Sequence, residues 1–392
     1  MKTLRNLFQT CLLCAVVLPA SVRAQLTFTT NNGAITITGY TGSTGLLVIP
    51  STTNGWPVTS VGNSAFYTNS SLTSVTIPDS VTNIGDYAFY ECTSLTNVTI
   101  GNGVTSIGNW AFVYCTGLTN ITIPDSVTTI GQDAFDSCHG LASVIIGTNV
   151  TNIAPAAFAQ CFSLTNVTIP DGVTTIGDYM FGDCIALPSV TIPNSVTKIG
   201  NYAFWTCGSL SNVTIGTSVS TIGSNAFETC VSLPNITIPT SVTNIDDYAF
   251  ANCPNLYAIY FQGNAPAADS TVFPEGTGSF SPGGIAAAVY YLPNTTGWYS
   301  PFGGLPAVLW NPLIQTTNSI FGIQNNQFSF NITGTTNIPI VVEACQNLAI
   351  PTWSPLLTCI LTNGSIYFGD SQWTNYPARF YRIRSLLGYE NF

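Results

Sequence analysis

The chain has 392 residues, which is more than one ordinary domain uses, and 45% of them are hydrophobic while only 6% are charged. The net charge of −10 leaves no basic track for a nucleic acid, so nucleic-acid binding is excluded. The single histidine, His139, excludes a multi-histidine metal site, and any catalytic pair built on histidine would have to use it.

Residues 1–24 have the pattern of a secretory signal peptide. Lys2 and Arg5 give a basic start, residues 12–18 form a short apolar core, and cleavage is expected after Ala24. The rest of the chain has no run of 18 apolar residues, so we expect no membrane span. Removing this segment leaves 4 basic and 17 acidic residues, a net charge of 4 − 17 = −13. We therefore expect an exported protein, either secreted or at the cell surface.

Residues 25–57 are predicted to form an N-terminal β cap. Hydrophobic and polar residues alternate in residues 26–30 and 34–40, and residues 46–50 are mainly aliphatic, which favours strands that cover the first repeat. Between residues 25 and 378 the only basic residue is Lys198. Ion pairs therefore cannot stabilise the body of the protein, and burial and backbone hydrogen bonds must do so.

Residues 58–262 are predicted to form a solenoid of nine repeats, each 23 residues long and without an insertion. Phenylalanine, cysteine and leucine recur at the same three positions of the unit. The phenylalanines are Phe66, Phe89, Phe112, Phe135, Phe158, Phe181, Phe204, Phe227 and Phe250. The leucines are Leu72, Leu95, Leu118, Leu141, Leu164, Leu187, Leu210, Leu233 and Leu256. Because the repeat length is constant, each coil is expected to superpose on its neighbour.

A single unit shows how one coil is expected to fold. Asp86 stands at a helix N-cap position, before a short helical turn that places Ala88, Cys92 and Leu95 on one face. Residues 97–100 alternate as a strand, and a second short extended piece follows. One coil cannot bury its own apolar residues, so stacking of the coils is obligatory.

The segment from Leu118 to Cys138, LTNITIPDSVTTIGQDAFDSC, fits the pattern L-x-x-V-x-I-P-x-x-V-x-x-I-G-x-x-A-F-x-x-C. The repeat therefore resembles the BspA-like class of leucine-rich repeats, also called the Treponema pallidum type. The resemblance implies a curved solenoid of short parallel strands and short helical turns on a bacterial or protist surface. It also implies a role in adhesion and no catalytic residues.

The chain is predicted to end in two further parts. Residues 263–312 are rich in proline, glycine and aromatic residues and are interpreted as the C-terminal cap of the solenoid. Residues 313–392 lack the repeat and are predicted to form a small all-β domain, with strands in residues 339–348, 365–370 and 378–386. The expected architecture is a leucine-rich repeat solenoid with β caps, followed by this domain.

Eight cysteines in the repeat register are predicted to form a structural ladder in the core. They are Cys92, Cys115, Cys138, Cys161, Cys184, Cys207, Cys230 and Cys253. Their side chains would run parallel, which suits packing and weak hydrogen bonds but is poor geometry for disulfides or a tetrahedral metal site. Asn69 takes the same position in the first unit, in keeping with that role. Cys345 and Cys359 lie outside the ladder, and a disulfide between them is predicted for an exported domain.

The outward side of the repeat strand is the predicted ligand face. It carries two columns, with Asn or Ser at one position and Thr two residues later. The candidate residues are Asn97, Thr99, Asn120, Thr122, Asn166, Thr168, Thr191, Asn212, Thr214, Asn235 and Thr237, and Ile145 interrupts the threonine column. Such donors and acceptors suit glycans or a protein backbone. The alternative is that threonine merely suits exposed strands and that asparagine ladders tie the coils together.

The remaining polar groups have structural interpretations. His139 is expected to be an exposed loop residue, and Asp79 and Asp125 are expected to serve turns rather than calcium binding, because no calcium-loop pattern is present. Tyr87 and Trp110 belong to a recurring aromatic position, for which packing and sugar stacking are the alternatives. We expect no cofactor and no metal, and we find no nucleophile with a base that would indicate an enzyme.

These patterns favour a non-enzymatic recognition or adhesion scaffold. It would bind an extracellular protein or polysaccharide, as a monomer, through the surface of the solenoid. The alternative is a structural component of a matrix or surface layer that assembles laterally without a dedicated ligand. Caps at both ends oppose end-to-end growth, which favours the first interpretation.

Overall fold

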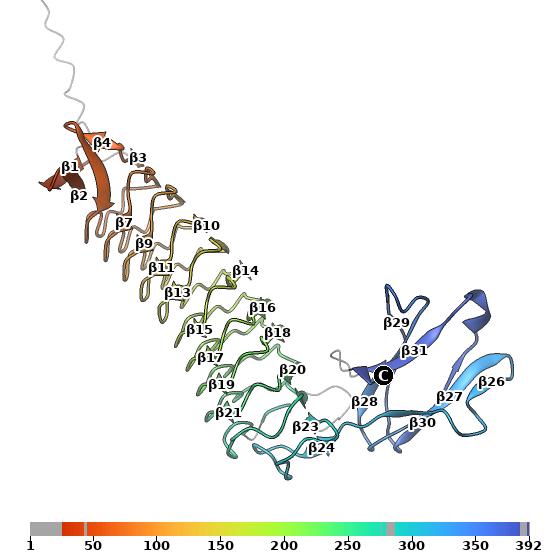
Figure 1. Ribbon diagram of the computed structural model, residues 1–392. Coiled ribbons are helices and arrows are strands. Elements are labelled where there is room, and N and C mark those ends of the chain that lie inside the picture. Colours follow the sequence, from red (N-terminus) through yellow and green to blue (C-terminus); the bar gives the residue numbers. More distant parts are fainter. Residues whose placement is uncertain (1–25, 43–44, 275, 280–286, 385–389, 392) are drawn as a thin grey trace, which may run out of the picture.

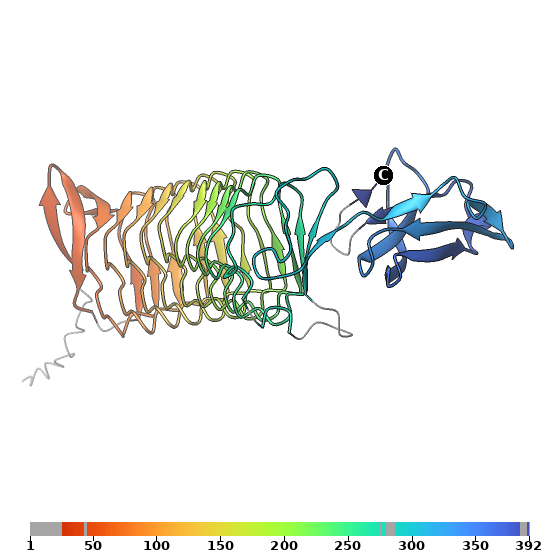
Figure 2. The ribbon, with the colours of Figure 1, turned by 90° about the horizontal axis from the view of Figure 1, so that it is seen from below.

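The computed structural model describes residues 26–42, 45–274, 276–279, 287–384 and 390–391. Over this part of the chain, coils stack side by side into one elongated solenoid, and a smaller β domain lies beyond its last coils (Figures 1 and 2). The predicted fold class, a repeat solenoid followed by an all-β domain, is confirmed. The predicted signal peptide lies outside the described residues.

The first strands form the N-terminal end of the solenoid. β1 (Leu26–Asn31) and β2 (Ala34–Tyr40) pair as an antiparallel hairpin, and β4 (Thr52–Thr53) pairs with β5 (Trp56–Val61). β2 and β5 pair in parallel, so β2 already belongs to a ladder that the repeats continue. The N-terminal cap is thus joined to the solenoid by the same backbone hydrogen bonds that join the coils.

One strand of each coil belongs to a first ladder of parallel strands, which strand pairing divides into four successive sheets of three, three, two and four strands. These strands are β3 (Leu46–Val48), β6 (Ser74–Thr76), β8 (Asn97–Thr99), β10 (Asn120–Ile123), β12 (Ser143–Ile146), β14 (Asn166–Val167), β16 (Ser189–Thr191), β18 (Asn212–Thr214), β20 (Asn235–Ile238), β22 (Ala258–Phe261), β23 (Ala288–Tyr291) and β24 (Ala307–Leu309). Equivalent residues of neighbouring repeats stand opposite each other, as Asn120 and Ser143 do, so like positions form columns.

The second extended piece of each coil belongs to another parallel ladder. After β2 and β5 its strands are β7 (Asn83–Ile84), β9 (Ser106–Ile107), β11 (Thr129–Ile130), β13 (Asn152–Ile153), β15 (Thr175–Ile176), β17 (Lys198–Ile199), β19 (Thr221–Ile222) and β21 (Asn244–Ile245). The isoleucine of each pair is buried and its partner is at least partly exposed. These strands therefore close the core on the side opposite the first ladder.

Turns occupy the position at which the sequence predicted a helical turn. In the segment after Asp86, Tyr87 and Glu91 have φ values of 56° and 54°, outside the right-handed helical region. The N–H groups of Tyr87, Phe89 and Glu91 donate to carbonyls of the next coil at 2.9, 2.7 and 2.8 Å, rather than within their own segment. Asp86 is not an N-cap either, because its Oδ1 accepts from the N–H of Asn109 in the next coil at 2.8 Å. Hydrogen bonds therefore also join neighbouring coils on the turn side of the solenoid.

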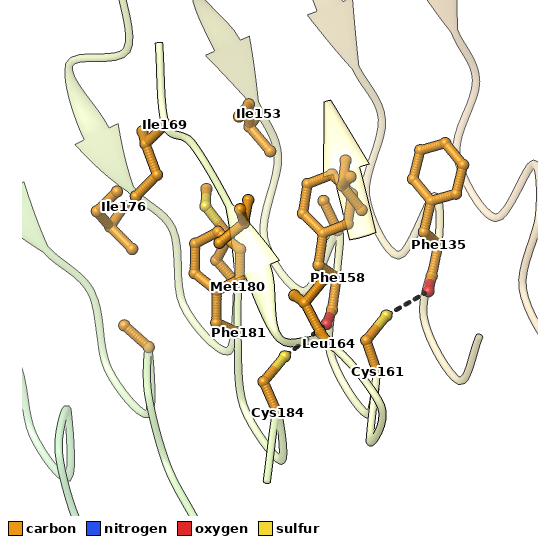
Figure 3. Close-up of a cluster of buried hydrophobic side chains, with 14 of the residues drawn as sticks. Phe135, Ile153, Phe158, Cys161, Leu164, Ile169, Ile176, Met180, Phe181 and Cys184 are labelled. Carbon is orange, nitrogen blue, oxygen red and sulfur yellow. Dashed lines mark hydrogen bonds between the residues drawn. The ribbon is translucent and has the colours of Figure 1, made fainter. Parts of the chain in front are cut away.

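A stack of phenylalanine rings fills the core. Neighbouring rings are nearly parallel, with centroids 4.8 Å apart for Phe66 and Phe89 and 5.8 Å apart for Phe158 and Phe181. Figure 3 shows this part of the core, in which Met180 takes the position that alanine holds in the other repeats. The widest ring spacing thus lies where the bulkiest neighbour packs.

The phenylalanine stack has one more ring than the nine predicted repeats supply. Phe273 lies 23 residues after Phe250, and the two rings stack at 5.4 Å. Ala267 likewise forms a parallel bridge with Asn244. A tenth coil therefore begins inside the predicted C-terminal cap. The sequence concealed it because no cysteine or leucine follows Phe273 in the repeat register.

Beyond the repeats, the first ladder continues through β22, β23 and β24, which pair in parallel. The C-terminal cap is therefore built mainly by extending the solenoid sheet. Its outward positions differ from those of the repeats, because Tyr260 and Tyr290 are buried there and stack at 5.1 Å.

The C-terminal domain consists of two small sheets around one core. One sheet contains β25 (Leu313–Gln315), β26 (Gly322–Gln324), β27 (Gln327–Thr333) and β30 (Ser365–Asp370). The other contains β28 (Pro339–Cys345), β29 (Ser354–Ile360), β31 (Phe380–Arg384) and β32 (Glu390–Asn391), and a short 3-10 helix, η2 (Trp373–Asn375), precedes β31. The three strands expected in this region correspond to β28, β30 and β31.

The C-terminal domain packs against the end of the solenoid. Phe330 and Ile340 of the domain share a buried cluster with Tyr260, Tyr290 and Trp310. The indole N–H of Trp310 donates to the carbonyl of Pro339 at 3.2 Å. The domain is thus attached by apolar contact as well as by the chain itself.

Candidate ligand face

The predicted ligand face lies on the outward side of the first ladder. Valine and isoleucine alternate with the face residues and point into the core, so the Asn and Thr side chains point to solvent. The exposed members are Asn97, Thr99, Asn120, Thr122, Asn166, Thr168, Thr191, Asn212 and Thr214. Asn235 and Thr237, at the C-terminal end, are half-buried.

The face ends where the C-terminal domain begins. Asn235 pairs with Ala258, and Thr237 pairs with Tyr260, in the parallel register of β20 and β22. Both partners are buried in the cluster that the C-terminal domain shares. The polar columns therefore give way to apolar ones at β22, which confines the open face to the strands before it.

A shallow hollow of about 580 Å³ lies on this face across β8, β10 and β12. Asn97, Thr99, Asn120 and Thr122 line it together with Ile145, whose side chain is 60% exposed. Ile145 stands opposite Thr122 in the threonine column and gives the hollow an apolar contact point. The sequence already shows that Ile145 interrupts the threonine column, but only the structure shows that a hollow surrounds this residue.

Side-chain hydrogen bonds along the face are sparse in the described residues. The amide of Asn97 donates to Ser74 Oγ of the preceding coil at 3.4 Å, whereas that of Asn120 donates to Thr119 Oγ1 within its own coil at 3.1 Å. A continuous asparagine ladder, the structural alternative for these residues, is therefore not formed. Most donors and acceptors of the face remain directed to solvent.

The cysteine ladder lies in the core and binds backbone. Each thiol is fully buried and donates to a phenylalanine carbonyl 26 residues earlier, as Cys161 does to Phe135 at 3.3 Å and Cys184 to Phe158 at 3.3 Å (Figure 3). Burial raises the pKa of these thiols, to about 12 for Cys92. A buried, protonated thiol with a backbone acceptor suits packing rather than nucleophilic or redox chemistry. Asn69 instead accepts from the N–H groups of Ser71 and Leu72 in its own turn, at 3.1 Å each.

The predicted disulfide between Cys345 and Cys359 is not formed, and both thiols are free. The two residues lie on the paired strands β28 and β29, but Cys359 stands opposite Ile340, five residues before Cys345. Five residues of strand span about 17 Å, whereas the Cα atoms of a disulfide lie within about 7 Å. The strand register, which the sequence did not reveal, therefore prevents the bond.

The acidic turn residues join neighbouring coils. Asp79 Oδ1 accepts from the N–H of Asn102 at 2.6 Å, and Asp125 Oδ1 accepts from that of Thr148 at 2.7 Å. No group of three or more His, Cys, Asp or Glu residues that could hold a metal ion occurs among the described residues. These carboxylates therefore accept hydrogen bonds from backbone N–H groups of the next coil.

His139 is half-buried, not exposed as predicted, because its ring stacks on Phe162 with centroids 4.5 Å apart. The neighbouring thiol of Cys138 points into the core and donates to the carbonyl of Phe112 at 3.1 Å. The structure therefore separates the two side chains, and no cysteine–histidine pair is formed. In the described part of the chain, no helix is long and apolar enough to cross a membrane.

Comparison with known proteins identifies the repeat. A model of the BspA type leucine rich repeat region matches residues 59–185 and 151–277, with six copies. The crystal structure of a leucine-rich repeat protein from Bacteroides ovatus is 28% identical, with a TM-score of 0.61 over 73% of this chain and 75% of that one. A leucine rich repeat protein from T. pallidum is 30% identical over 53% of this chain and 88% of that one, with a TM-score of 0.44.

A leucine rich cell surface protein from Faecalibacterium prausnitzii is 29% identical over 68% of this chain and 94% of that one, with a TM-score of 0.31. No curated protein matches the sequence. The repeat model spans more than half of the 392 residues, and the matched residues cover the repeated coils. The chain therefore belongs to the BspA type leucine-rich repeat family.

Proposed function

We propose that this protein is an exported, non-enzymatic recognition scaffold that binds an extracellular protein or polysaccharide through its strand face. The observation that carries the proposal is the open row of exposed Asn and Thr side chains from Asn97 to Thr214. Parallel strands repeat these groups about every 4.8 Å, so an extended partner would meet the same donors and acceptors in successive coils. Many weak contacts of this kind support binding by avidity.

The hollow around Ile145 supports a preferred point of contact within this face. It is the place where an apolar side chain is surrounded by the amides of Asn97 and Asn120 and the hydroxyls of Thr99 and Thr122. Recognition surfaces commonly combine an apolar centre with polar groups that orient the partner. The secretory pattern of residues 1–24 supports export.

The test is a binding screen of residues 25–392 against arrays of extracellular glycans and matrix proteins. A variant with Thr122→Lys, Thr168→Lys and Thr214→Lys places a long cationic side chain on every second coil of the strand face. We expect this variant to lose at least tenfold in affinity for the partner that the parent chain binds, because the added side chains cover the neighbouring amides and hydroxyls.

A matched control carries Thr105→Lys, Thr151→Lys and Thr197→Lys. These threonines are exposed, have the same spacing along the chain, and precede strands of the second ladder. The control changes net charge equally and should bind like the parent. Equal losses in the two variants, or binding that survives in the strand-face variant, would exclude the strand face as the site.

Lateral self-assembly is the second candidate, and one observation favours it. Leu46 and Val48 of β3 are 74% and 71% exposed at positions where β6, β8 and β10 carry Asn, Ser or Thr. Two aliphatic side chains on a terminal strand can pair with a second molecule. Sedimentation of the parent and of a Leu46→Thr, Val48→Thr variant separates the candidates, since an assembling protein should become monomeric in the variant.

A further inference from the structure

Five aromatic side chains form a connected cluster on the turn side of the first coils. We name Tyr67, Tyr87, Tyr90, Trp110 and Tyr114 the aromatic ridge. Tyr67 stacks on Tyr90 and Tyr87 stacks on Trp110, with centroids 4.9 Å apart in both pairs. Tyr114 meets Tyr90 edge-on at 6.1 Å, and Tyr67 meets Tyr87 edge-on at 6.5 Å. Rings from three successive coils are thus held in one preformed surface.

The backbone does not explain why aromatic residues occupy these positions. Tyr87, Trp110 and Tyr114 have φ values of 56°, 54° and 57°, in the left-handed region that favours Gly, Asn and Asp. Other coils place Asp133 or Asn225 at the position of Trp110. Stacking compensates for part of this cost, yet Tyr114 remains 40% exposed. Tyr67, which is not in the left-handed region, is 49% exposed. A cost of this kind at an exposed position points to a use outside the fold.

The surroundings of the ridge are acidic and contain no cation of their own. Asp86 and Glu91 belong to the same turns as Tyr87 and Tyr90, and Asp133 follows Trp110 in its column. No lysine or arginine occurs between residues 26 and 197. Ring faces carry the negative part of the aromatic quadrupole, so rings and carboxylates together favour a positively charged group.

The C-terminal domain shows how this chain uses such rings when a cation is present. Arg379 lies over the ring of Tyr376 at 4.1 Å, and Arg382 lies over that of Trp353 at 4.2 Å. The side chains of both arginines are only 10% exposed and are paired with carboxylates. They are not available to the ridge of a second copy of this chain, which leaves Lys198 as the exposed cation of the solenoid, a single charge against several rings. A partner that carries several cations therefore fits the ridge better than a second copy does.

We propose that the aromatic ridge is a second binding surface, which takes lysine and arginine side chains of a basic partner protein by cation–π contact. Arginine is the better fit, because its planar guanidinium stacks on rings and is weakly hydrated. The mature chain's negative charge steers such a partner toward the solenoid, and the preformed rings need little ordering on binding. This surface is distinct from the strand face, so either site can fail its test while the other stands.

The test uses residues 25–392 and a fluorescent nona-arginine peptide, with binding followed by anisotropy at low salt and at 150 mM salt. Tyr67→Leu with Tyr114→Leu removes two rings but keeps apolar area and charge. We expect this variant to bind five- to thirtyfold more weakly, since two exposed cation–π contacts contribute about that much. Tyr67→Phe with Tyr114→Phe keeps the rings and should bind like the parent, provided that all variants unfold at the same temperature.

Tyr248→Leu is the matched control. Tyr248 has a φ of 59°, is 46% exposed, and follows Asp247, but lies far from the ridge along the solenoid. Its substitution should change affinity less than twofold. Unchanged binding by the ridge leucine variant, or an equal loss in Tyr248→Leu, would show general charge attraction and overturn the proposal. A ridge that binds cellohexaose, with leucine substitutions affecting this sugar and not the peptide, would overturn it in favour of a glycan site.

Discussion

The solenoid and the C-terminal domain hold their buried groups by opposite means. The solenoid buries stacked phenylalanine rings and protonated thiols, and Lys198 is its only cation. In the C-terminal domain, Glu343 contacts Arg382 and Arg384 at 2.7 and 2.6 Å. Asp370 contacts Arg379 there at 2.6 Å. Buried ion pairs therefore hold the charged side chains of this domain.

Repetition explains the difference. In-register parallel coils place each side chain beside its own equivalent, so a charge repeated in every coil would stack on its own sign. Neutral residues, which pack or hydrogen-bond with their own kind, can be repeated without that penalty. Asp79 and Asp125 obey this rule, because Asn102 occupies the equivalent position of the coil between them. The irregular domain can instead bring opposite charges together.

The largest expected effect is a loss of solenoid stability at alkaline pH. Burial raises the pKa of all eight ladder thiols, to about 12 for Cys92 and Cys253, from 9.0 for an exposed thiol. Above pH 9 the thiols of the unfolded chain lose protons that the folded state keeps. The contribution of the protonated thiols to the free energy of unfolding is therefore fully present below pH 9 and is lost as pH rises toward 12. At pH 10 Cys92 and Cys253 together lower the free energy of unfolding by roughly 3 kcal/mol, and the other six thiols act in the same direction. Urea unfolding at pH 7.5, 9 and 10 with a reductant measures it.

Single substitutions attribute this pH dependence to the ladder. Cys161→Ala removes one of the eight thiols and should reduce the slope of unfolding free energy against pH by about one eighth. Cys359→Ala, in the C-terminal domain, should leave the slope of the solenoid unchanged. A solenoid equally stable at pH 7.5 and pH 10 would contradict the buried, protonated ladder.

Phe158→Ala should remove about 3–5 kcal/mol from the free energy of unfolding, because it leaves a cavity in the middle of the ring stack. Phe158 is fully buried between the rings of Phe135 and Phe181, at 5.4 and 5.8 Å. Urea denaturation measures the change, and Thr168→Ala on the exposed face should stay within about 0.5 kcal/mol of the parent. A loss below 1 kcal/mol would mean that the stack contributes little.

Glu343→Gln tests the ion pairs of the C-terminal domain and should cost about 3 kcal/mol, since it leaves Arg382 and Arg384 without their buried carboxylate. Burial alone would raise the pKa of Glu343, but the hydrogen bonds and charges of Arg384 and Arg382 outweigh it and lower the pKa below 4.5. The contribution of the Glu343 carboxylate to stability is therefore present above pH 4.5 and is lost as pH falls through its lowered pKa.

Acid titration of the domain, followed by thermal unfolding, should show this loss in the parent and not in the Gln variant. Ser365→Ala, at an exposed position of β30, should preserve the parent's profile. An unchanged acid profile in Glu343→Gln would place the acid-sensitive group elsewhere.

Asp136→Asn should have the smallest effect and the opposite sign. Burial raises the pKa of Asp136 to about 6, although Ser137 donates a hydrogen bond to it. Because the pKa of Asp136 is raised in the folded state, the stability that depends on its protonated form is fully present below pH 3.8 and is lost as pH rises through about 6. At pH 7.5 the neutral amide should therefore stabilise the solenoid by about 1 kcal/mol, allowing for solvent screening. Melting temperatures at pH 4 and 7.5 check this, with Asp171→Asn on an exposed turn as the control, and an equal gain at both pH values would contradict it.

The repeat length predicted much of the fold and of the strand face. The spacing of Phe66 to Phe250 indicated stacked coils, and the alternation around Asn97 and Thr99 identified the exposed columns. Local patterns were less reliable. The turn after Asp86 looked helical because Ala88 and Cys92 are four residues apart, but alternate N–H groups from Tyr87 onward donate to carbonyls of the next coil instead.

The sequence by itself determined the period, the buried and exposed columns, and the scarcity of cations in the solenoid, because these follow from residue type and spacing along one chain. Only the tertiary structure decided the turn conformation, the tenth coil at Phe273, the free thiols of Cys345 and Cys359, and the ring contacts of the aromatic ridge. Each of these depends on how strands pair or on contacts between residues in different coils, such as the hydrogen bond from Tyr87 to Asn109, which are 22 positions apart. Such contacts are set by how coils and sheets meet, and local propensity does not specify them.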